Sequence, residues 1–171
     1  MSKDKKQPVK VKIYSINTNL DVSGILADLL YKPIKEEERV EFQKEINDWL
    51  SKPEASRGPR PNLEREKMTG PEFFKDIVLK SLQMAHKTGN TALLRRTKAI
   101  GDLMDHAIEK KKGILEIMDE DFKYIKSAMG KADAWENHQG VAYAVVMVED
   151  AINKAENDNR DPEDSDAGKE S

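Results

Sequence analysis

Apolar side chains recur with helical spacing along most of this chain, and this spacing limits its fold more than any other feature. The clearest stripe lies near the C-terminal end, at positions i, i+4, i+7, i+11 and i+14: Val141, Val145, Val148, Ile152 and Ala155. This is the period of one face of an α-helix, and such a face must be buried against another element. We therefore expect a last helix over about 140–156.

Other stretches carry similar stripes, separated by glycine, proline or asparagine residues that end helices. The helices that they predict cover about 22–31, 35–50, 69–87, 91–112 and 119–129. The two long helices on either side of residues 88–90 are joined by a short break, so they should pack antiparallel.

The strongest helix start is at Thr69. Glu72 follows three residues later, as in a capping box, and Pro71 is tolerated in the first turn of a helix.

Two short segments have the pattern of strands. Residues 9–16 alternate, which places Val9, Val11 and Ile13 on a half-buried face and Lys10 and Lys12 on the exposed one. Residues 114–117 form the other extended segment. The two segments should pair, because an isolated strand leaves its backbone groups without partners.

The predicted fold class is mainly α, a small helical domain with a minor two-stranded β element and disordered termini. Residues 9–156 form a single domain with an exposed loop at 51–68, which is rich in proline and poor in large apolar residues. Residues 1–8 form a disordered basic arm and residues 157–171 a disordered acidic tail. The predicted core contains Phe74, Val78, Leu82, Ile100, Met104, Ile108, Phe122, Ile125, Val145, Val148 and Ile152.

The charge is concentrated at the two ends. Residues 1–12 carry net +4 and residues 156–171 net −5, whereas the whole chain carries −3. The middle of the chain therefore has little net charge, and binding of nucleic acid over the whole body is not expected. The acidic end favours a role in solubility or in tuning a partner.

Composition excludes several kinds of site. The chain has no cysteine, so it has no disulfide, thiolate metal site or cysteine nucleophile. No apolar run approaches the length of a signal peptide or a membrane span, so we expect no membrane partner and an intracellular, soluble protein. A protein delivered inside a virus particle would have the same composition.

No motif of an enzyme is recognisable, and we expect no catalytic residue, metal site or cofactor. The nearest candidate is the helix face Asp102, His106 and Glu109, where a carboxylate and an imidazole point the same way. No second pair of ligands accompanies it, so we interpret it as a solvated polar face. His86 and His138 are interpreted as surface histidines near helix ends.

Five residues are candidates for an interface: Trp135, Arg57, Arg60, Arg95 and Arg96. The four arginines could bind phosphate, although no aromatic residues interleave with them as single-strand binding would favour. Pairing to acidic residues, within the chain or on a partner, is the alternative interpretation. Trp135 lies in a polar loop, where it either closes the core from outside or anchors a partner.

Three stretches in this order resemble small helical proteins encoded by tailed bacteriophages. They are TGPEFFKDIVLKSL (69–82), LRRTKAI (94–100) and GILEIMDEDFKYIK (113–126). The resemblance covers about residues 69–152, and residues 1–68 lie outside it. It implies a virus-encoded role in structure, assembly or interaction with the host, and it transfers no catalytic residue.

Two functional hypotheses follow. The first is a non-enzymatic structural or assembly accessory protein of the phage type, which self-associates and binds other phage or host proteins. The second is a small regulator that binds nucleic acid or inhibits a host nucleic-acid enzyme.

Overall fold

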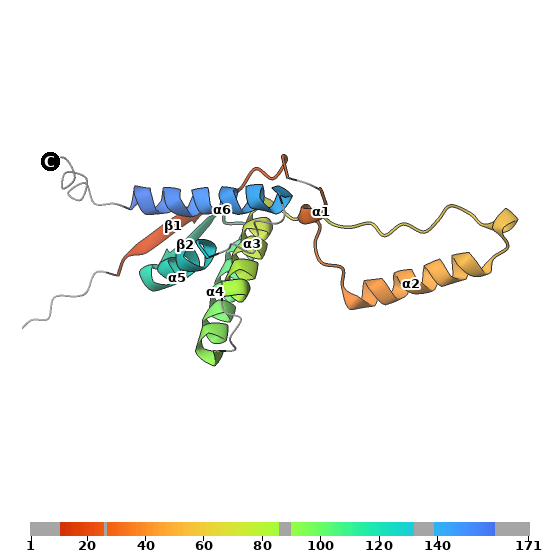
Figure 1. The fold of residues 1–171 in the computed structure, drawn as a ribbon, viewed down its shortest axis with the longest axis horizontal. Helices are drawn as coiled ribbons and strands as arrows, with labels where there is room; N and C mark the ends of the chain where they lie inside the picture. The colour runs from red at the N-terminus through yellow and green to blue at the C-terminus, as the bar shows by residue number, and fades with distance from the viewer. Residues whose placement is uncertain (1–10, 26, 86–89, 132–138, 160–171) are drawn as a thin grey trace, which may run out of the picture. The chain divides into compact units, whose positions relative to one another are not determined.

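The computed structural model describes residues 11–25, 27–85, 90–131 and 139–159 (Figure 1). Over these ranges the chain is mainly helical with one two-stranded antiparallel sheet, which confirms the predicted fold class. The chain divides into two compact units. We call them the body, whose described residues are 11–25, 69–85, 90–131 and 139–159, and the insert, whose described residues are 27–68. A single domain over 9–156 stays a prediction, because two compact units can share one unfolding transition.

The body combines helices with the small sheet. Its elements are β1 (Ile13–Asn17), α3 (Gly70–Ala85), α4 (Thr91–Glu109), β2 (Ile114–Met118), α5 (Asp119–Met129) and α6 (Gln139–Asp158). Helices α3 and α4 pack side by side, and α6 lies along β1 (Figure 1). The four helices predicted for this region are confirmed to within a few residues. The arm at 1–8 and most of the acidic tail lie outside the described residues, although α6 continues to Asp158.

The predicted pairing of the two extended segments is confirmed, because β1 and β2 form an antiparallel ladder that pairs Ile13 with Met118 and Asn17 with Ile114. The predicted inward face of the first strand is wrong. Tyr14 and Ile16 are buried, whereas Ile13 is 52% exposed. Val11 is exposed as well, and Val9 lies outside the described residues.

Tyr14 explains the choice of face. Its ring stacks on Phe122 of α5, with centroids 3.8 Å apart and an interplanar angle of 6°. Side chains alternate along a strand, so seating Tyr14 inward turns Ile13 outward.

The hydrophobic core of the body lies between the helices and the inner face of the sheet. All the predicted core residues are buried except Ile108, which is half-buried. The core also takes in residues outside the predicted list, and the largest of these are Phe73, Ile16, Leu115 and Ile117.

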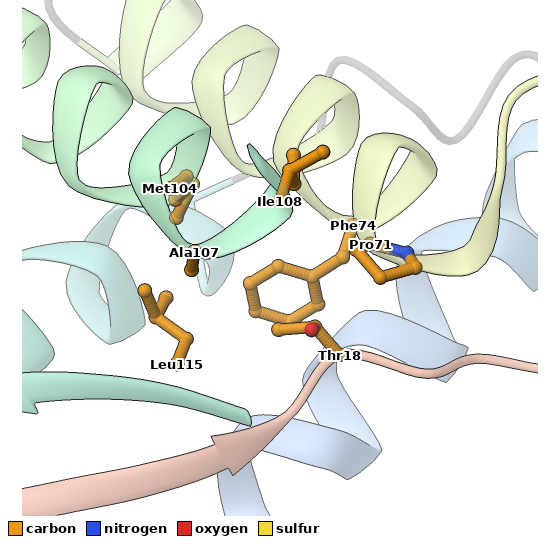
Figure 2. A pocket seen from close by; sticks show the side chains of 7 residues that line it. All are labelled: Thr18, Pro71, Phe74, Met104, Ala107, Ile108 and Leu115. Carbon is orange, nitrogen blue, oxygen red and sulfur yellow. The ribbon is translucent and has the colours of Figure 1, made fainter. Parts of the chain in front are cut away.

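A small internal space of about 10 Å³ remains where α3, α4 and the sheet meet (Figure 2). It is lined by apolar side chains, with Phe74 beside Thr18. Thr18 is only 5% exposed, and no hydrogen bond of its hydroxyl is found within the described part of the chain. A buried hydroxyl without a partner lowers stability.

Helix α3 begins close to the backbone of Leu20, in the stretch that follows β1. Glu72 accepts hydrogen bonds from the Thr69 backbone N–H (2.8 Å) and from the Thr69 hydroxyl (2.9 Å), so this half of the predicted capping box is present. A Cβ atom at Gly70 would lie 2.6 Å from the Leu20 carbonyl oxygen and 2.7 Å from its nitrogen. Only glycine fits this approach without a shift of backbone.

The insert contains α1 (Ala27–Leu30), α2 (Glu36–Ser51) and a short 3-10 helix, η1 (Glu54–Ser56). Its two ends are joined by an antiparallel bridge between Tyr31 and Lys67. The hydrogen bonds Lys32 N to Glu66 O (2.9 Å) and Met68 N to Leu30 O (2.6 Å) flank this bridge.

The prediction of a helix over 22–31 is wrong in its first half. There Asp21 accepts a hydrogen bond from the Ser23 N–H (3.0 Å), which stabilises a turn instead.

Candidate functional site

Helix α2 of the insert has an apolar stripe but no buried residue. Phe42, Ile46 and Trp49 of this stripe are half-buried, and Leu50 is 51% exposed. An amphipathic helix in a globular protein normally buries its apolar side. The insert therefore presents apolar area of the kind that partner proteins cover.

Trp49 and Arg57 hold the turn after α2. The Trp49 indole N–H donates to the Gly58 carbonyl (2.8 Å), and the Arg57 guanidinium lies 5.0 Å from the centre of the Trp49 ring. Arg57 also donates to the carbonyls of Leu50 (2.8 Å) and Lys52 (2.9 Å). Arg57, predicted as an interface residue, therefore also closes this turn.

Arg60 has a different setting. It is exposed, and it lies between Pro59 and Pro61 in a stretch without helix or strand. The nearby Arg65 instead lies over the Tyr31 ring at 4.7 Å and donates to the Lys32 carbonyl (3.3 Å).

Arg95 and Arg96 differ although they are neighbours on α4. Arg96 donates to Asp121 (2.7 Å), lies 3.9 Å from the Glu120 carboxylate, and places its guanidinium 4.9 Å from the centre of the Tyr124 ring. Arg95 is exposed. The interpretation of pairing to acidic residues within the chain therefore holds for Arg96.

The four predicted arginines are divided between the two units. Arg57 and Arg60 belong to the insert and Arg95 and Arg96 to the body, whereas Trp135 lies outside the described residues.

Asp102, His106 and Glu109 are all exposed on α4. Within the described ranges, no group of three or more His, Cys, Asp or Glu side chains is arranged to hold a metal ion. His86 and His138 lie outside those ranges.

The body also has a groove of about 420 Å³ that was not predicted from the sequence. It lies between β1 and α6, and its apolar lining includes Leu20, Ile114 and Met147. Its polar lining residues are Ser15, Asn17, Asp150, Lys154 and Asp158. These residues are far apart in the sequence, so no spacing could indicate the groove.

A second hollow of about 210 Å³ lies where α5 ends beside α6. Burial raises the pKa of Glu149 in its lining, and the nearby Asp150 charge raises it further. Lys126, also in the lining, is paired with Glu156. Because its cation is engaged in this way, we assign no ligand to the hollow.

Comparisons with known proteins give no match: no protein-family model, curated protein or solved structure is similar to this chain. Over the described residues, no helix combines the length and the apolar character needed to cross a membrane.

Proposed function

We propose that this chain is a non-enzymatic structural or assembly accessory protein of the kind encoded by tailed phages. It acts through protein–protein contacts, including contacts between its own copies, and its other partners are phage or host proteins. The order of the three stretches at 69–82, 94–100 and 113–126 supports the viral origin. On this proposal the protein works in the host cytoplasm or in the virion.

One observation carries the proposal, namely the unburied apolar stripe of α2. Transfer of apolar surface from water is worth roughly 25 cal/mol per Å². A partner that covers Phe42, Ile46 and Leu50 would therefore add stability that the insert alone does not provide. The Trp49–Arg57 stack beside them combines two residue types that are enriched in the centres of interfaces.

Sedimentation velocity of the full chain over a wide range of concentrations tests the proposal. We expect the mean mass to rise above 19.4 kDa as the concentration increases. Leu50→Lys should weaken this association, because it places a charge on the apolar side of α2. Val40→Lys is the matched control, since Val40 is similarly exposed (45% against 51%) but lies on another side of the same helix.

A chain that stays monomeric at every concentration would contradict self-association. Equal effects of Leu50→Lys and Val40→Lys would instead remove the α2 stripe from the interface.

A further inference from the structure

The groove of the body has the chemistry of a site for an extended peptide. Two hydrogen bonds continue the β1–β2 ladder by one residue pair at each end: Thr18 N to Gly113 O (2.9 Å) and Asp119 N to Lys12 O (3.1 Å). In an antiparallel ladder this places the even-numbered residues of β1 in hydrogen-bonded pairs with β2. The backbone groups of Ser15 and Asn17 therefore point away from β2, along the edge that lines the groove.

This edge is only partly occupied. The Asn159 side chain donates to the Ile13 carbonyl (2.9 Å), which covers one end of it. Among the described residues, no hydrogen bond is found for the backbone N–H and C=O groups of Ser15. An edge strand with free backbone groups can accept an added strand, and neighbouring pockets then select its side chains.

The opposite edge of the sheet is less suitable for pairing between copies. Glu116 lies at the centre of β2 and is exposed. Symmetric pairing of two β2 strands about this centre would place two Glu116 carboxylates opposite each other, which is unfavourable.

The stretch 59–63 of the insert, Pro-Arg-Pro-Asn-Leu, is suited to the free edge of β1. Proline restricts its own φ and holds the preceding residue in an extended conformation, so Arg60 is already extended before it binds. Arg60 and Asn62 keep their N–H donors, whereas Pro59 and Pro61 have none. Alternate residues of a strand direct their backbone groups to opposite sides. The N–H donors of Arg60 and Asn62 therefore face the same side of the strand. Pro59 and Pro61 face the other side, where they disfavour pairing with a further strand.

Length and charge agree with this fit. The α6 residues that line the groove run from Met147 to Asp158, about 16 Å at the rise of an α-helix. Five residues of a β-strand cover a similar length at about 3.3 Å each. The stretch 57–63 carries two arginines and no acid, and the groove carries two aspartates and one lysine. Helix α2 suits the groove less well, since it has six acidic and two basic residues.

We propose that residues 59–63 of one copy add as a third strand to the edge of β1 in a second copy, with Arg60 beside Asp150 or Asp158. This inference rests on the proposed self-association and names the surfaces that carry it. The strand supplies backbone hydrogen bonds, and the arginine selects the register.

Complementary charge reversal tests the contact. Arg60→Glu and the double variant Asp150→Arg/Asp158→Arg each bring like charges together, so each alone should raise the dissociation constant for self-association at least about tenfold. An equimolar mixture of the two variants should restore the wild-type constant, because opposite charges then meet between different molecules. Contact within one chain would give no such recovery, since each chain still holds like charges. Arg95→Glu and Asp102→Arg are controls at exposed positions of α4, outside the groove.

The outcomes separate this inference from the proposed function. A wild-type chain that never associates would overturn both. Wild-type association that Arg60→Glu changes no more than Arg95→Glu would overturn the inference and leave self-association intact. Loss of association in both variants without recovery in the mixture would also overturn the contact between copies.

Discussion

Helices α2 and α3 have the same length, sixteen residues, but α3 buries six of them and α2 none. Both carry apolar residues at helical spacing. In α3, Phe73 and Ile77 widen the stripe so that about half of the helix can enter the core. The stripe of α2 is narrow, and six acidic residues surround it. A helical stripe therefore predicts a helix, and the width of the stripe indicates whether the helix is buried within its own unit.

The largest effect on stability should come from replacing a phenylalanine by alanine on each of the two helices in turn. Phe74→Ala removes a fully buried ring beside the internal space, so it should lower the free energy of unfolding by about 3–5 kcal/mol. Phe42→Ala should cost less than about 1 kcal/mol, because Phe42 is half-buried on a helix without a buried residue. Urea denaturation of the monomer measures both. Equal losses in the free energy of unfolding would contradict the difference in burial between α2 and α3.

A second pair of substitutions compares glycines of the two units. Gly70→Ala in the body drives a Cβ into the Leu20 backbone and should cost about 1–3 kcal/mol. Gly58→Ala in the insert meets open space and should change stability by less than about 0.5 kcal/mol. Thermal unfolding of the two variants gives the comparison. If Gly70→Ala leaves the stability unchanged, the backbone at Leu20 can shift to make room for the added Cβ.

Thr18→Val tests the one polar group in the lining of the internal space. Valine has nearly the same shape without the hydroxyl, so the unfolding free energy should rise by about 1 kcal/mol. Thr91→Val, at an exposed position of α4, is the control and should change it by less than about 0.5 kcal/mol. A loss of stability in Thr18→Val would indicate that the hydroxyl has a partner in solution.

The smallest effect concerns pH. A hydrogen bond from Lys123 holds the pKa of Asp119 below its ordinary value of 3.8, and a hydrogen bond from Tyr14 lowers that pKa further. Since the folded state has the lower pKa, the Asp119 contribution to stability is present above the unfolded value. It is lost as the pH falls through the folded one.

Wild type and Asp119→Asn should therefore differ at neutral pH and converge in acid, as denaturation at several pH values will show. In a Lys123→Met background, Asp119→Asn should have a smaller effect. A difference that does not change with pH would contradict this account.

The sequence allowed much of the body to be predicted. Helix spacing identified α3, α4, α5 and α6, and the need of strands for partners predicted the β1–β2 pairing. These are local patterns or general requirements of the backbone. The inward face of β1 could not be predicted, because a shift of one residue exchanges the buried and exposed faces of a strand. The stack of Tyr14 on Phe122 favours the observed face, and Phe122 is far from Tyr14 in the sequence.

The candidate interface was less predictable, because contacts between residues far apart in the sequence determine it as well. Arg95 and Arg96 are equivalent in sequence, and only the fold brings Asp121 to Arg96. The groove joins β1, the start of β2 and α6, so its residues share no pattern along the chain. The signal that could have been used is the alternation of proline with Arg60 and Asn62, which indicates a strand suited to an edge.

The bridge between Tyr31 and Lys67 fixes where the insert leaves the main path of the chain and where it rejoins it. A segment whose two ends are held together can be lengthened, shortened or exchanged at little entropic cost to the rest of the chain, since the cost of closing a loop grows only slowly with its length. Residues 32–66 are thus a segment that can be replaced as a unit with little effect on the core of the body. On the proposed function, such a replacement would change the partner while the core stays the same.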